Sequence, residues 1–130
     1  MAGVLSLPEH LRAMGSTPFT WGTSDCCLAA SDWMLACRGI DPAAPLRGRY
    51  TTMRGALRHI RRLGGFEAMV SDLMRDAGFV ETTEPKIGDV GVVDSDQGQA
   101  LAIRTQIGWA VKGVNGFVVA PFSHTKAWSV

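Results

Sequence analysis

The spacing of apolar residues changes near residue 79, and this change constrains the fold more than any other feature of the chain. Before residue 79 the apolar residues recur every three or four positions, as in helices with one buried face. After it they fall in short runs and alternations that are typical of strands. Helices followed by consecutive strands indicate the α+β class. We therefore predict a single domain over residues 1–130, with a helical half in 1–78 packed on an antiparallel β-meander in 79–130.

Capping residues and glycines give the expected ends of the helices. The expected helices run from Ser6 to Gly15, from Thr23 or Ser24 to Gly39, from Thr51 or Thr52 to Leu63, and from Gly65 to Gly78. Hairpin signals at 96–98 and 115–116 separate the expected strands, which are 89–93, 100–105, 108–112, 117–120 and 127–130. These strands predict an antiparallel sheet against which the second helix packs.

Composition and charge narrow the class of protein. Hydrophobic residues make up 46% and charged residues 19% of the chain, so a folded globular domain is expected rather than a disordered one. The net charge of +1 indicates no particular partner. No apolar run reaches the roughly 18 residues of a membrane helix, and no secretion signal begins the chain, so we expect no membrane partner. The three cysteines, two of them adjacent, fit a reducing compartment rather than a disulfide framework.

The segment Trp21-Gly22-Thr23-Ser24-Asp25-Cys26 places a thiol in the first turn of the second helix. Unpaired backbone N–H groups and the helix dipole favour a thiolate at such a place, and a thiolate is the nucleophilic form. The alternative is that Cys26 is a small buried apolar residue, since free cysteine is often buried. Cys37 lies about 16 Å further along the same helix, which excludes a metal shared by the two. We expect no metal and no cofactor.

This segment resembles the start of the NlpC-type papain-like cysteine peptidases, in which Trp-Gly, a short gap and Asp-Cys precede a helix. In that family a later Gly-Asp opens the sheet, and the following strand carries a histidine as the general base. Gly88-Asp89 matches the Gly-Asp, but Ala100 occupies the position of the histidine. The third residue of the triad would fall near residues 110–112, where the match is also poor. The resemblance implies a papain-like NlpC-type domain in which Cys26 is a vestigial nucleophile.

The chain is also similar to peptidase-like proteins encoded in the tail gene clusters of tailed phages and prophages. The shared segments are the Trp-Gly-x-x-Asp-Cys start and residues 47–50, 63–65, 88–93 and 127–128. This resemblance implies a structural component of the tail tip, or baseplate, made in the bacterial host cytoplasm and incorporated into the virion. Its partners would be the neighbouring hub, distal tail or tip proteins. The alternative is a cysteine peptidase or amidase that cleaves peptidoglycan peptides during DNA entry.

Three histidines could replace the missing base if the fold brought one of them to Cys26. His10 borders the apolar stripe of the first helix, His59 flanks that of the third helix, and His124 is expected in a loop near the C-terminus. None of the three lies in a recognised motif. Asp25 is either a first-turn residue favoured by the helix dipole or a catalytic acid, and the dipole is the better explanation.

Arginines are concentrated between residues 47 and 62, a segment that contains no acidic residue. They are Arg47, Arg49, Arg54, Arg58, Arg61 and Arg62. On the third helix the arginines avoid the apolar stripe, which consists of Met53, Ala56, Leu57, Ile60 and Leu63. A solvated helix face and a docking surface for an acidic protein both fit this pattern. Nucleic acid is disfavoured as a partner because no aromatic platform accompanies the arginines.

Overall fold

A computed structural model describes residues 6–130 of the chain. The first five residues of the predicted helical half lie outside the described residues. The helices are α1 (Leu7–Ser16), α2 (Cys26–Arg38), α3 (Met53–Arg62) and α4 (Phe66–Ala77). The strands are β1 (Val90–Ser95), β2 (Gly98–Arg104), β3 (Trp109–Gly113), β4 (Gly116–Ala120) and β5 (Ser123–Trp128). The α+β class and the change from helices to strands are therefore confirmed.

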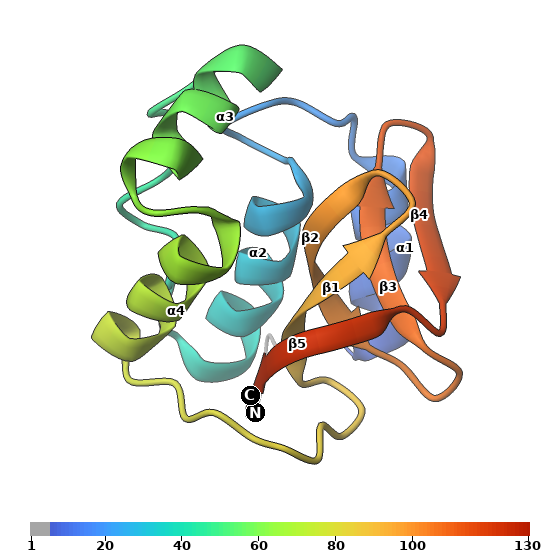
Figure 1. Ribbon diagram of the computed structural model, residues 1–130. Helices are drawn as coiled ribbons and strands as arrows, with labels where there is room; N and C mark the ends of the chain where they lie inside the picture. Colours follow the sequence, from blue (N-terminus) through green and yellow to red (C-terminus); the bar gives the residue numbers. More distant parts are fainter. Residues whose placement is uncertain (1–5) are drawn as a thin grey trace.

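The five strands form one antiparallel sheet in the order β4-β3-β2-β1-β5 (Figure 1). Strands β1 to β4 follow one another as hairpins, and the chain then returns to place β5 beside β1. The last strand spans Ser123–Trp128, so the prediction of a strand at 127–130 is wrong at both ends. Its first residues are polar and largely exposed because they lie at the edge of the sheet, and no apolar alternation marks them in the sequence.

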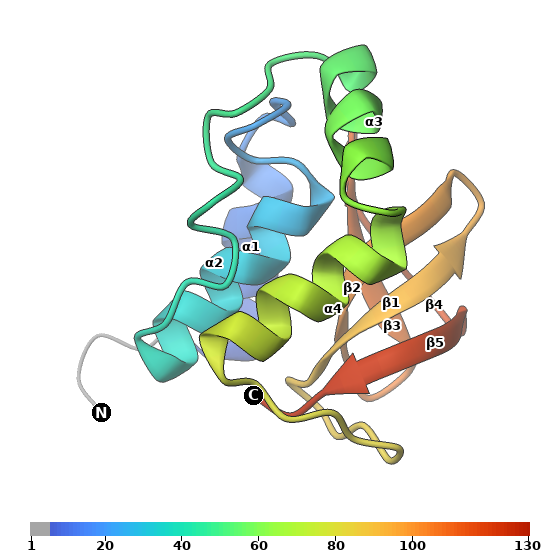
Figure 2. The ribbon, with the colours of Figure 1, turned by 60° about the vertical axis from the view of Figure 1, so that its left-hand side comes forward.

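Helices α1, α2 and α4 cover one face of the sheet (Figures 1 and 2). Helix α2 lies against β2 and β3, and its fully buried residues Leu28 and Met34 belong to the main core between the two layers. The sheet contributes alternate residues of β1 and β2 to this core, which are Val90, Val92, Leu101 and Ile103. Because side chains along a strand alternate between the two faces, the residues between these point away from the main core.

A second, smaller apolar cluster lies on the opposite face of the sheet. It comprises Val93, Ala100, Ala102, Trp109 and Ala127. Trp109 approaches β1 at Gly91, where an added Cβ would come within 2.8 Å of the indole ring. Only glycine leaves room for the indole at this position, so Gly91 allows Trp109 to fill the centre of the second cluster.

Helix α3 stands at one end of the molecule and packs mainly against α4 (Figure 2). Of the apolar stripe predicted for this helix, only Ala56 is buried. Met53, Leu57 and Leu63 are 58%, 52% and 41% exposed. The turn at residues 64–65, both glycines with positive φ, takes the chain directly into α4 and leaves most of the stripe uncovered.

Candidate functional site

The carboxylate of Asp25, which is 1% exposed, organises the start of α2. Asp25 caps the helix by accepting a hydrogen bond from the backbone N–H of Leu28 at 3.0 Å. It also accepts the N–H of Gly22 at 3.0 Å and the hydroxyl of Tyr50 at 2.7 Å. Three donors from three parts of the chain therefore satisfy one buried carboxylate, as a buried charge requires.

The cap of α2 differs from the one that the sequence predicts. Neither Thr23 nor Ser24 caps the helix, because Asp25 occupies the N-cap position with an extended backbone. The hydroxyl of Ser24 donates instead to the backbone carbonyl of Pro18. Asp25 is thus a capping residue that also joins two loops, and it has no contact that marks it as a catalytic acid.

The loop that contains Trp21 and Gly22 is hydrogen-bonded to the segment at residues 47–50. The backbone N–H of Gly48 donates to the carbonyl of Gly22 at 2.9 Å. Gly22 has a φ of 83°, and a Cβ on it would overlap the backbone carbonyl oxygen of Tyr50 at 1.9 Å. Glycine is therefore required at residue 22 by both backbone conformation and space. Two segments that the phage-tail resemblance singled out form one structural network around Asp25.

Tyr50 is the member of the Asp25 network that the sequence did not reveal. Burial, and secondly the Asp25 carboxylate, raise its pKa well above the usual value, so the phenol remains a hydrogen-bond donor at all ordinary pH values. It is the single tyrosine of the chain, but no spacing or periodicity relates it to Asp25, which is 25 residues away. The available signal was its place in the Arg-Gly-Arg-Tyr segment.

Cys26 is half-buried and packs against the second apolar cluster. Burial, and secondly the adjacent Asp25 carboxylate, raise the pKa of its thiol to about 11, while hydrogen bonds from the backbone of Leu101 and of Cys27 oppose the rise. The thiol is therefore protonated near neutral pH. Burial is the main reason why this helix start does not favour a thiolate, and the capping carboxylate of Asp25 adds a negative charge that further opposes one.

Ala100 presents a methyl group at the position where the resemblance expects the general base. It lies on β2, paired with Val93 of β1, and belongs to the cluster against which Cys26 packs. Alanine can neither accept nor donate a proton, so residue 100 cannot act as the general base that the resemblance implies. Ala100 is 4% exposed, so its methyl group is a packing group of this cluster.

Of the candidate bases, His124 lies on β5 and His59 on α3. His124 lies in β5 rather than in the predicted loop, opposite Val93 and with its ring 5.4 Å from that of Trp109. Because adjacent strands are about 4.8 Å apart, His124 is about 10 Å from the backbone of Ala100. His59 is half-buried on α3 with its ring 6.2 Å from that of Tyr50. Within residues 6–130 no histidine is hydrogen-bonded to the sulfur of Cys26.

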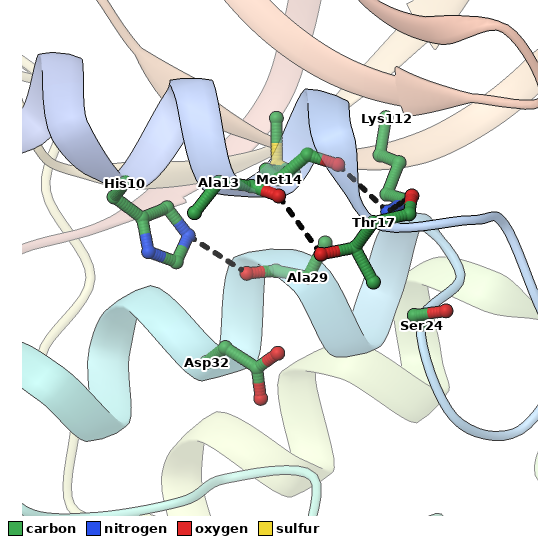
Figure 3. A pocket seen from close by; sticks show the side chains of 8 residues that line it. All are labelled: His10, Ala13, Met14, Thr17, Ser24, Ala29, Asp32 and Lys112. Atoms are coloured by element: carbon green, nitrogen blue, oxygen red, sulfur yellow. Dashed lines mark hydrogen bonds between the residues drawn. The ribbon is translucent and has the colours of Figure 1, made fainter.

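His10 and Lys112 line opposite ends of a small cavity of about 90 Å³ between α1 and α2 (Figure 3). The Nε2 atom of His10 is 3.2 Å from the carbonyl oxygen of Ala29, and burial lowers its pKa. Lys112, on the strand where the third triad residue was expected, donates to the carbonyls of Met14 and Thr17 at 2.8 and 2.6 Å. It therefore satisfies the C-terminal end of α1, which is a structural function.

The six arginines of the 47–62 segment do not form one surface. Arg47 is half-buried and binds Asp41 at 2.6 Å and Asp32 at 2.8 Å, and the hydrogen bond with Asp41 is the main cause of its raised pKa. The segment itself contains no acidic residue, and the partners of Arg47 are Asp32 and Asp41, which precede it in the chain. The other five arginines are exposed, and none of them forms an ion pair within the described part of the chain. They are Arg49, Arg54, Arg58, Arg61 and Arg62.

Residues 6–130 contain no cluster of histidine, cysteine or carboxylate side chains suited to a metal ion. Among the helices of the same residues, none is both long enough and apolar enough to cross a membrane.

Fold and site define an α+β domain in which a buried carboxylate network lies beside a protonated thiol. The chain belongs to the family described as Domain of unknown function (DUF6950), whose model matches residues 5–130. Comparison with curated proteins and with solved structures gave no match.

Proposed function

We propose that the protein is a structural component of the tail tip of a tailed phage or prophage, built on an NlpC-type papain-like fold and lacking hydrolytic activity. The tail assignment rests on the resemblance of the Trp-Gly-x-x-Asp-Cys start and of residues 47–50, 63–65, 88–93 and 127–128 to tail-cluster proteins. The network around Asp25 supports it, because the first two of these segments are held together there. The partners would be the hub, distal tail or other tip proteins.

The proposal that the protein lacks hydrolytic activity rests on Ala100, which contributes a methyl group to the cluster against which Cys26 packs. A cysteine peptidase needs a thiolate and an imidazole within about 3 Å of it. Here the thiol has a pKa of about 11, mainly because it is buried. The rival assignment, a peptidase or amidase acting on peptidoglycan, would require both conditions to be met by a rearrangement of the site.

Mass spectrometry of purified particles tests the assignment to the tail. We expect peptides of this protein in intact particles, and in detached tails at an abundance comparable with that of other tip proteins. A cytoplasmic host protein of similar abundance in the lysate is the control for contamination. Detection in the lysate together with absence from washed particles would exclude a virion component.

A further inference from the structure

Helix α3 presents two parallel rows of side chains to solvent. Met53 and Leu57, 58% and 52% exposed, lie one turn apart and form an apolar row that we name the α3 ridge. Arg54, Arg58 and Arg61 follow the same helical spacing beside it and are exposed. At 100° per residue, Arg54 and Arg61 project next to the ridge, on the side away from the buried Ala56.

A shallow hollow continues the ridge toward α4. It is lined by Leu57, Ile60, Arg61, Gly64 and Gly65. The two glycines contribute only backbone to this lining, whereas Leu57 and Ile60 contribute aliphatic side chains. An apolar side chain from another molecule fits such a hollow, with Arg61 at its rim.

Charge on this face is unbalanced. Helix α3 contains no acidic residue, and within residues 6–130 none of its arginines lies in an ion pair. Arg47, by contrast, already binds Asp32 and Asp41. Arginines that stay unpaired next to exposed apolar side chains are typical of protein interfaces, which are enriched in arginine and in methionine.

We propose that α3 is the docking surface for an amphipathic helix of an acidic partner protein. The apolar side of that helix would cover the α3 ridge and the hollow, and its carboxylates would face the row formed by Arg54, Arg58 and Arg61. This arrangement is the helix-in-groove mode of recognition with charged flanks that fix the register. That the partner is a tail protein rests on the proposed function, whereas the surface itself does not.

The same features disfavour two other occupants. A second copy of the chain would bring its own arginine row against this one, and like charges facing each other oppose association. A membrane surface would need an apolar face free along the whole helix, but Ala56 is buried against the body of the protein. The helix also has no tryptophan or tyrosine to anchor it at a lipid interface.

Binding of designed peptides to the full-length protein tests the proposal. The probe is a fluorescein-labelled helical peptide of about 14 residues, or four turns, with leucines on one face and glutamates on both flanks. A scrambled peptide of the same composition and a peptide with lysine in place of glutamate are the controls. In fluorescence anisotropy at low salt we expect the acidic helix to bind at least about tenfold more tightly than either control.

Variants of the protein locate the binding to α3. We expect Met53→Gln with Leu57→Gln, and separately Arg54→Glu with Arg58→Glu, each to weaken binding of the acidic helix by about tenfold or more. Val114→Gln, at a residue 78% exposed in the β3–β4 turn, and Arg12→Glu on the exposed side of α1 are matched controls that should leave binding unchanged. Circular dichroism of each variant reports whether it is folded.

Several results would overturn the proposal. Equal binding of the acidic and scrambled peptides is one. Preferential binding to phosphatidylglycerol vesicles, or a dimer that the ridge substitutions dissociate, would assign the surface to a membrane or to a second copy. The tail assignment is judged separately by the particles. If the protein is present in particles but does not bind the peptide, only the proposed docking surface is contradicted. If it binds the peptide but is absent from particles, only the tail assignment is contradicted.

Discussion

At the scale of single residues, Asp25 has a function that its surroundings in the sequence only partly indicate. The helix dipole correctly favours an acidic residue at the start of α2. The sequence does not show that its carboxylate also accepts the N–H of Gly22 and the hydroxyl of Tyr50, because those contacts depend on the path of a distant loop. The protonated state of Cys26 could not be predicted for the same reason, since burial by the sheet is its main cause.

Replacing Asp25 by alanine should lower the free energy of unfolding by about 3 kcal/mol, because buried donors lose their acceptor. Tyr50→Phe should cost about 2 kcal/mol, since it removes a hydrogen bond to a charged group. In the double variant the cost of Tyr50→Phe should almost disappear, because the two groups interact directly. Urea denaturation measures all three values. Additive costs would show that the Tyr50–Asp25 hydrogen bond contributes nothing.

At the scale of elements, local signals and tertiary contacts explain which predictions succeed. The four helices were predictable because caps and glycines mark their ends and apolar spacing marks their faces. The sequence could not show that the stripe of α3 stays exposed, since periodicity identifies an apolar face without identifying what covers it. Strand β5 was predicted too late for a related reason, as an edge strand can be polar at its outer end.

The exposure of α3 leads to a contrast between two leucines. Leu28 of α2 is 0% exposed, and Leu28→Ala should lower the free energy of unfolding by about 2–5 kcal/mol through the cavity it leaves. Leu57 of α3 is 52% exposed. Leu57→Gln should therefore change the free energy of unfolding by no more than about 0.5 kcal/mol. Chemical denaturation of the two variants checks this. A large loss for Leu57→Gln would mean that the Leu57 side chain, and not Ala56 alone, is buried against the rest of the protein in solution.

At the scale of the whole molecule, the packing of helices on the sheet places the Cys26 thiol against an apolar cluster and out of hydrogen-bonding contact with any histidine of residues 6–130. Helix α2 brings Cys26 to the cluster that contains Ala100, while His10, His59 and His124 lie on α1, α3 and β5. The class of fold followed from the order of helices and strands. The positions of the histidines relative to the thiol could not be predicted from the sequence. They depend on the strand order and on the direction in which α3 leaves the core.

The central claim is that the protein acts in the tail by its structure and without a catalytic thiol. Complementation of a phage lacking this gene tests it most directly, with plaque titre as the readout. The unaltered gene should restore the titre, and Cys26→Ala should restore it equally, because the proposed function assigns the half-buried thiol a packing role alone. A Cys26→Ala protein that folds and enters particles but fails to restore the titre would contradict the claim and show that the thiol takes part in infection.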